Sequence, residues 1–192
     1  MTHSSVVEKG SALRRSIHVL TGLGSVYYFI PEKLLPWLDR ETALVLVLLF
    51  VLAFESVRIQ LSLKIIGMRP YEYTRLSGFA WAFLGIGTVV LFFPFYIAVP
   101  ALASMALMDP LAGELRARGL SKLSDIILPL SFTIYLVSFI LFHLTLVTAA
   151  PLALAGSLIA WLSERLKFKS IDDDYLMSVL PAVGIIALRT LI

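Results

Sequence analysis

Long apolar runs, separated by short polar segments, dominate the sequence. A helix needs about 20 predominantly apolar residues to cross a bilayer, and fewer if it ends in the interface. Seven runs approach that length, and we expect each to form a transmembrane helix. They are roughly Ser16–Ile30, Glu41–Val57, Leu76–Phe93, Phe95–Met108, Ile126–Phe142, Leu144–Leu162 and Tyr175–Leu191. The pattern predicts an all-α polytopic bundle of about seven spans that forms a single integral membrane domain over residues 1–192.

Prolines, glycines and charges indicate how these helices are connected. Pro94 separates the third and fourth runs and predicts a tight reversal, because proline cannot continue the helical hydrogen-bond ladder. If those two runs form a re-entrant pair, the count falls to six spans. Gly85 and Gly87 predict close helix approach in the third run. The segment Gln60–Arg75 is amphipathic and too charged to span, so we expect it to lie along the membrane interface.

The composition excludes an ordinary soluble domain. Hydrophobic residues make up 59% of the chain and charged residues only 15%, whereas about a quarter of the residues of a soluble domain are charged. The chain has no cysteine, which excludes a disulfide framework, a thiolate metal site and a cysteine nucleophile. The basic residues lie next to apolar spans, so we do not expect nucleic acid as a partner. The oligomeric state stays open.

The distribution of charge predicts an orientation. If the N-terminus is cytoplasmic, 13 of the 16 Lys and Arg residues fall on the cytoplasmic side, as the positive-inside rule requires. The three on the outer side are Lys33, Arg40 and Arg189. Ten of the 13 acidic residues also fall inside. We therefore expect an integral protein of the plasma membrane, with carboxylates and an active site at its cytoplasmic face.

Three consecutive aspartates, Asp172, Asp173 and Asp174, precede the last apolar run. A charge near a bilayer is costly unless it has a partner or a function. Adjacent carboxylates repel one another, and a cation among them relieves that repulsion. The triplet therefore predicts a divalent metal site. The alternative is an acidic turn that caps the last helix, where negative charge is favoured, and the two interpretations are compatible.

Four further polar clusters are expected on the same side of the membrane. Two lie near the first two spans: Arg14-Arg15-Ser16-Ile17-His18 and the pair Glu55 and Arg58. Two follow later, Asp109 to Gly119 and Lys122 to Asp125, and Glu164 closes the sixth run before the aspartates.

Taken in this order, the motifs resemble those of the CTP-dependent lipid-alcohol kinases: dolichol kinase, phytol kinase and CTP-dependent diacylglycerol kinase. These belong to the phosphatidate cytidylyltransferase superfamily. The matches to the family pattern are Arg14-Arg15-Ser-Ile-His18, Glu55 with Arg58, Ser77-Gly78, Phe93-Pro94, Met108-Asp109-Pro-Leu-Ala112, Lys122 with Asp125, Glu164, Ile171-Asp172-Asp173-Asp174 and Pro181. The departures are Met108 and Ile126, which stand where the family has glycine, and Asp174, which stands where it has asparagine.

The resemblance implies a kinase that uses Mg²⁺ and CTP to phosphorylate the hydroxyl of a membrane lipid alcohol of the polyprenol, dolichol or phytol type. Phosphoryl transfer consists mainly of positioning and charge neutralisation, and Mg²⁺ prefers carboxylate oxygens. The expected metal ligands are Asp109, Asp172 and Asp173. The expected nucleotide-binding residues are Arg14, Arg15, Arg58, Arg118 and Lys122, since cationic side chains hold phosphate oxygens. The expected catalytic residues are Asp109, Asp173, His18 and Glu164, with His18 or an aspartate as the base.

Several alternatives stay open. Glu55 and Arg58 lie three residues apart on a helix, so they could simply pair with each other, and His18 could be a hydrogen-bonded core residue. A cytidylyltransferase that forms a CDP-lipid would use the same metal and nucleotide, and diacylglycerol could be the acceptor. A lipid-binding or transport protein without catalytic activity is the rival from another class. A transporter would be expected to carry its charges near the middle of the spans.

Overall fold

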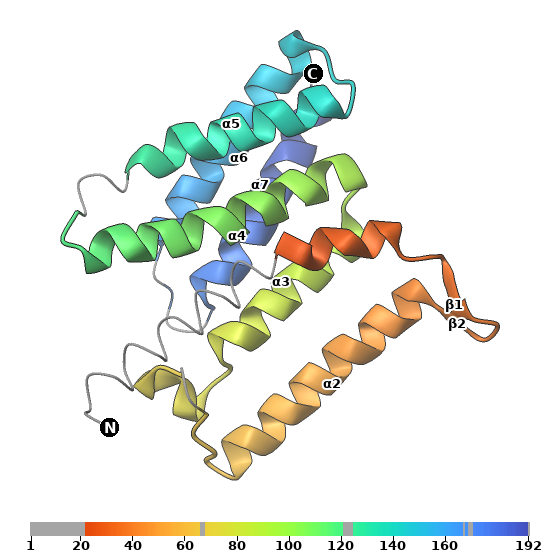
Figure 1. Cartoon of the computed structure of the whole chain (residues 1–192), viewed down its shortest axis with the longest axis vertical. Helices are drawn as coiled ribbons and strands as arrows, with labels where there is room; N and C mark the ends of the chain where they lie inside the picture. Colours follow the sequence, from red (N-terminus) through yellow and green to blue (C-terminus); the bar gives the residue numbers. More distant parts are fainter. Residues whose placement is uncertain (1–21, 66–67, 121–124, 167, 169–170, 192) are drawn as a thin grey trace.

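A computed structural model of the chain describes residues 22–65, 68–120, 125–166, 168 and 171–191. Most of this part is helical, which confirms the predicted all-α class (Figure 1). The helices are η1 (Gly22–Phe29), α2 (Arg40–Gln60), η2 (Pro70–Thr74), α3 (Gly78–Phe92), α4 (Phe95–Ala117), α5 (Ile127–Leu141), α6 (Leu146–Arg165) and α7 (Asp173–Arg189). A small antiparallel hairpin, β1 (Lys33–Leu35) and β2 (Leu38–Asp39), pairs Lys33 with Asp39 and Leu35 with Leu38.

Three of the described helices, α2, α4 and α6, are long and apolar enough to cross a membrane. Helices α3 and α5 are apolar but shorter, with 15 residues each. Large apolar side chains on α2 are exposed, such as Phe50 at 71%, and a continuous apolar surface of this kind marks a partner or a lipid-facing side rather than a solvated one. These features indicate a membrane protein. The number of seven spans stays a prediction.

The helix boundaries follow the sequence pattern closely at most positions. The second run was expected at Glu41–Val57 and forms Arg40–Gln60, with Asp39 as N-cap accepting a hydrogen bond from the Thr42 amide at 2.6 Å. The reversal at Pro94 is confirmed, because this residue is extended and caps the start of α4. Of the first expected run, the described residues form only the short 3₁₀ helix η1.

The fourth run is longer than expected. The sequence predicts that it ends at Met108, but α4 continues to Ala117. The reason is that its apolar side does not stop at Met108: Met108 and Ala112 are both buried in a cluster with Ile127 of α5 and Met177 of α7. Asp109 therefore lies within a helix rather than in a connecting segment.

Close helix packing positions the polar end of the bundle. Helix α6 packs against both α5 and α7, and α3 packs against α7 and α2. The expected close approach at Gly85 and Gly87 is confirmed. A Cβ on Gly85 would lie 2.4 Å from Ser178 Oγ and 3.3 Å from Tyr175 Cα of α7, and one on Gly87 would lie 2.5 Å from Leu48 Cδ1 of α2.

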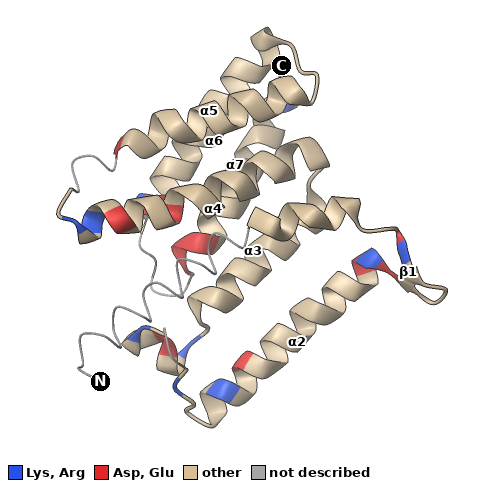
Figure 2. Ribbon diagram, in the orientation of Figure 1, with Lys and Arg blue, Asp and Glu red and all other residues tan. Residues whose placement is uncertain are grey.

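The charges of the described residues gather at the two ends of the bundle. Figure 2 shows most of them where α2, α4 and α6 end and where α3 and α7 begin. A smaller group lies at the opposite end, around the hairpin and the first turn of α2, and it includes Lys33 and Arg40. The predicted concentration of carboxylates at one end is thus confirmed for this part of the chain.

Candidate functional site

The three aspartates meet at the N-terminus of α7. One carboxylate oxygen from each of Asp172, Asp173 and Asp174 lies within 4.8 Å of the others. Asp172 is the N-cap and accepts a hydrogen bond from the Asp174 amide at 3.3 Å. Asp173 and Asp174 are buried, with exposed fractions of 7% and 0%. The cluster therefore caps the helix, as one interpretation expected, and also places three carboxylates at cation-binding distance from one another.

A fourth carboxylate approaches from a distant part of the chain. Glu72 of η2 is buried and accepts hydrogen bonds from the Arg69 amide at 2.7 Å and the Gly78 amide at 3.2 Å. A Cβ on Gly78 would lie 3.3 Å from Glu72 Oε1, 3.6 Å from Asp174 Oδ2 and 3.7 Å from Asp172 Oδ2. The acidic groups of η2 and α7 thus converge on the first turn of α3, and glycine leaves the room for them.

Burial raises the pKa of Asp172 to about 6, helped by the hydrogen bond and the repulsion from Asp173. A cation among these oxygens would favour the ionised form instead. Mg²⁺ takes carboxylate oxygens together with water or phosphate oxygens. The donor set consists only of such hard oxygen ligands, so the residues present fit Mg²⁺ or a similar divalent ion.

A cavity of about 580 Å³ opens beside the aspartates, which is within the usual range for a small-molecule site. Its lining residues are Arg69, Tyr71, Arg75, Leu76, Trp81, Arg116, Leu166, Phe168, Ile171, Asp172 and Asp173. The cavity therefore brings three arginines and two carboxylates together with an apolar remainder. Trp81 also lines this cavity and contacts the Tyr175 ring edge to face, with centroids 5.5 Å apart.

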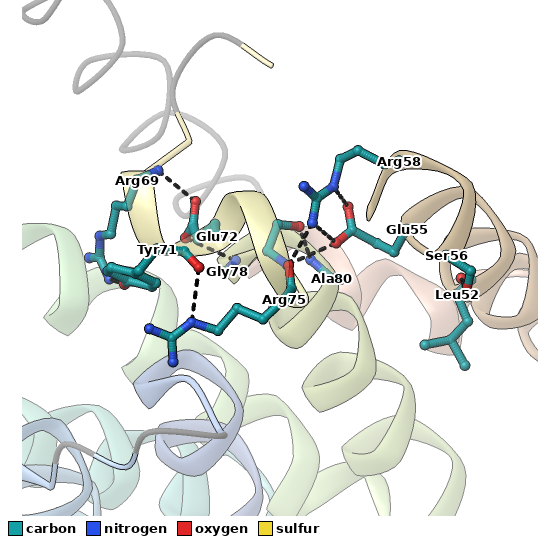
Figure 3. Close-up of polar contacts among 11 residues, drawn as sticks. Leu52, Glu55, Ser56, Arg58, Arg69, Tyr71, Glu72, Arg75, Gly78 and Ala80 are labelled. Atoms are coloured by element: carbon teal, nitrogen blue, oxygen red, sulfur yellow. Dashed lines mark hydrogen bonds and ion pairs between the residues drawn. The ribbon is translucent and has the colours of Figure 1, made fainter. Parts of the chain in front are cut away.

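Glu55 and Arg58 form a buried pair that joins α2 to the start of α3 (Figure 3). Arg58 donates to both oxygens of Glu55, from Nε at 2.9 Å and from Nη2 at 2.8 Å, and their exposed fractions are 0% and 1%. Arg58 Nη2 also donates to the Arg75 carbonyl at 2.6 Å, while Glu55 accepts from the Ser77 amide at 2.8 Å. Arg58 is not among the cavity-lining residues. Its hydrogen bonds give it a positioning role, and the nucleotide contact stays a prediction.

The structure also describes three other predicted residues. Glu164 is buried at the end of α6 and forms an ion pair with Arg116 on the cavity wall. Arg118 is 69% exposed and pairs with Glu114 instead of lining the cavity. Asp109 is half-buried on α4 and is not part of the cluster that Asp172 and Asp173 form with Asp174. Asp172, Asp173 and Asp174 therefore form the possible cation site of the described residues, and the predicted metal role of Asp109 stays a prediction.

Four predicted residues, Arg14, Arg15, His18 and Lys122, lie outside the described part of the chain. The sequence interpretation missed the residues that the structure adds, which are Arg69, Tyr71, Glu72, Arg75, Trp81 and Arg116. Most of them come from the segment expected to lie along the interface. Its unusual density of arginines and tyrosines just before an apolar helix was the available signal.

The polar end of the bundle therefore combines an acidic cluster suited to a divalent cation with a cavity that carries cationic side chains. Such a combination can hold an anionic ligand and a metal ion together. Comparison of the chain with protein-family models, with curated proteins and with solved structures found no match in any of the three.

Proposed function

We propose that the protein is a Mg²⁺-dependent kinase that transfers the γ-phosphate of CTP to the hydroxyl of a membrane lipid alcohol, with a polyprenol, dolichol or phytol as the preferred acceptor. The observation that carries this proposal is the position of the aspartate cluster. Asp172 and Asp173 line the cavity, and Arg69, Arg75 and Arg116 line it too. Carboxylates for a metal ion and guanidiniums for phosphate are the parts that phosphoryl transfer requires. CTP and the lipid acceptor rest on the motif resemblance.

In the proposed reaction, the lipid hydroxyl oxygen forms a bond to the γ-phosphorus while the bond from that phosphorus to the β–γ bridging oxygen breaks. The products are a lipid phosphate and CDP, and the hydroxyl proton passes to a base. That base is His18 or an aspartate, as the sequence interpretation left it. Asp172, Asp173 and Asp174 would hold the cation, and Glu164 orients Arg116. When bound, Mg²⁺ neutralises phosphate charge and orients the transferred group.

The proposed topology has about seven spans, a cytoplasmic N-terminus and the active site at the cytoplasmic face of the plasma membrane. Its support is the separation of charge along the bundle. The end that carries the aspartates also carries most of the basic residues (Figure 2), and basic residues are enriched on the cytoplasmic side. A lipid hydroxyl at headgroup depth would there meet a soluble nucleotide.

The test is a transfer assay on the purified protein in detergent with γ-labelled CTP, Mg²⁺ and a panel of polyprenol, dolichol, phytol and diacylglycerol. Label in a lipid product is the expected result. A parallel reaction with phosphatidate in place of the alcohol tests the rival cytidylyltransferase, which would join this lipid phosphate to the CMP part of CTP and release labelled pyrophosphate together with a CDP-lipid. If neither product forms with any acceptor, both enzyme functions are refuted.

The substitution Asp173→Asn tests the role of the cluster. We expect it to lower lipid phosphorylation at least about a hundredfold, because it removes one carboxylate charge from the proposed metal site. The matched control is Glu41→Gln, since Glu41 is an exposed carboxylate in the first turn of α2, at the opposite end of the bundle from the aspartates. Activity retained by the Asp173 variant would remove that residue from the site.

A further inference from the structure

Two arginines share one tyrosine ring at the mouth of the cavity. The guanidinium carbon of Arg75 lies 4.4 Å from the Tyr71 ring centroid, and that of Arg69 lies 5.5 Å from it. Arg75 Nε also donates to the Tyr71 carbonyl at 3.1 Å, and Arg69 donates to the Tyr71 hydroxyl. Figure 3 shows these three side chains together. Tyr71 therefore fixes two positive charges beside the same cavity.

This arrangement has an electrostatic cost. Two guanidiniums held around one ring repel each other, and a cation–π contact at an exposed site is weak. Asp172 compensates part of this charge, with Oδ2 at 3.9 Å from Arg69 Nη1. An anion bound between the two arginines would remove the repulsion.

A third arginine reaches the cavity from another helix. Arg116 of α4 lines the cavity and is about half exposed, whereas its partner Glu164 is buried. A buried carboxylate holds the guanidinium in place and leaves part of it facing the cavity. Guanidiniums bind phosphate oxygens through a planar fork that matches their geometry. Arg69, Arg75 and Arg116 therefore supply preorganised donors from two segments far apart in sequence.

We propose that Arg69, Arg75 and Arg116 form a phosphate-binding subsite, organised by Tyr71 and adjacent to the metal-binding carboxylates. Its ligand is a phosphate or pyrophosphate group. The same chemistry could come from a soluble nucleotide or from the headgroup of a phosphorylated lipid. The subsite deepens the proposed kinase function and rests on it for the biological source of the phosphate. It takes the role that the sequence interpretation had given to Arg58 and Arg118.

The experiment uses the full chain in phosphatidylcholine nanodiscs at a fixed Mg²⁺ concentration, with pyrophosphate as the probe in calorimetric titration. We expect Arg75→Gln and Arg116→Gln each to weaken binding about tenfold or more, since a hydrogen bond to a charged group contributes about 1.5–3 kcal/mol. The matched control is Arg189→Gln, because Arg189 is an exposed arginine in the last turn of α7, where it lies over the Tyr96 ring and does not line the cavity. Its Kd should stay within about twofold of the wild-type value. Equal binding by the wild type, Arg75→Gln and Arg116→Gln would overturn the subsite.

Two tyrosine variants test the organising role. Tyr71→Phe keeps the ring and should bind pyrophosphate nearly as well as the wild type, whereas Tyr71→Leu should weaken binding about as much as Arg75→Gln. Wild-type affinity in Tyr71→Leu would refute this role. Arg75→Lys keeps the positive charge but lacks the planar guanidinium, so it serves as a second variant if Arg75→Gln impairs folding. An intermediate Kd is expected, and wild-type affinity would argue against fork recognition.

Phosphatidate in the nanodiscs separates the two sources of phosphate. If it competes with pyrophosphate in the wild type but not in Arg116→Gln, the subsite takes lipid phosphate. If pyrophosphate binds equally in both lipid mixtures, the subsite takes a soluble phosphate. Failure of the kinase proposal and failure of the subsite proposal give different results. A protein without kinase activity that binds pyrophosphate through these arginines refutes only the kinase, and an active kinase whose pyrophosphate affinity ignores them refutes only the subsite.

Discussion

The substitution Glu55→Leu removes the carboxylate on which the buried Arg58 depends. Glu55 accepts three hydrogen bonds, two from Arg58 and one from the Ser77 amide, all between 2.8 and 2.9 Å. Arg58 has no exposed surface, so the variant leaves a buried guanidinium charge without its counter-ion. Breaking a buried ion pair from one side costs about 3–5 kcal/mol. We expect the free energy of unfolding to fall by that amount.

The assay is thermal unfolding in detergent, followed by intrinsic fluorescence. For a chain of this length, a loss of about 3 kcal/mol lowers Tm by roughly 6 °C or more. The control is Glu114→Leu, which breaks the exposed pair with Arg118 and should cost less than about 1 kcal/mol. The double variant Glu55→Leu/Arg58→Met should recover part of the loss, because it also removes the stranded charge.

Two results would refute this reasoning. A Tm for Glu55→Leu within about 2 °C of the wild type would mean that the pair contributes no more than a surface contact. A double variant less stable than Glu55→Leu alone would mean that the uncompensated charge is not the source of the loss. Either result would also weaken the positioning role of the pair, since the same atoms hold the Arg75 carbonyl and the Ser77 amide.

Two further predictions concern pH and packing. The pKa of Asp172 rises from 3.8 to about 6, so protonation favours the folded state, and this contribution is complete below about pH 3.8 and lost as the pH rises through 6. In EDTA, the Tm of the wild type should therefore fall relative to that of Asp172→Asn between pH 5 and pH 7.5, because the ionised carboxylate is the form that burial disfavours. Mg²⁺ should raise the wild-type Tm more at pH 7.5, and the opposite order would contradict the assignment. Gly85→Ala should lower Tm and Mg²⁺ affinity together, because its Cβ would lie 3.3 Å from the α7 backbone, and an unchanged Mg²⁺ affinity would show that α3–α7 spacing does not control the cluster.

The apolar pattern predicted the helices well because burial in a bilayer requires long uninterrupted runs. The end of α4 was missed because its last turns are amphipathic: Met108 and Ala112 are buried in one cluster with Met177, while Asp109 and Arg116 are polar positions between and after them. A hydropathy window records such a stretch as polar. The packing partner that makes the helix continue lies on α7, and a linear pattern contains no information about it.

Part of the candidate site could also be predicted from the sequence. Asp172 and Asp173 could be predicted, because a run of acidic residues beside an apolar span has few structural explanations. Glu72, Arg75 and Arg116 could not be singled out in the same way, since isolated charges near a membrane are usually headgroup-facing anchors. Their role depends on which charges the fold brings to one cavity.

The close approach of α3 and α7 brings the acidic groups of the candidate site together. Glu72 and Asp172 lie 100 residues apart in sequence, yet both border the backbone of Gly78. Gly85 lies seven residues further along α3, about two helical turns away, and it contacts α7 at Tyr175 and Ser178. Small residues allow this approach inside the apolar part of the bundle, so the distance between the acidic groups at the polar end is determined by packing within the apolar layer.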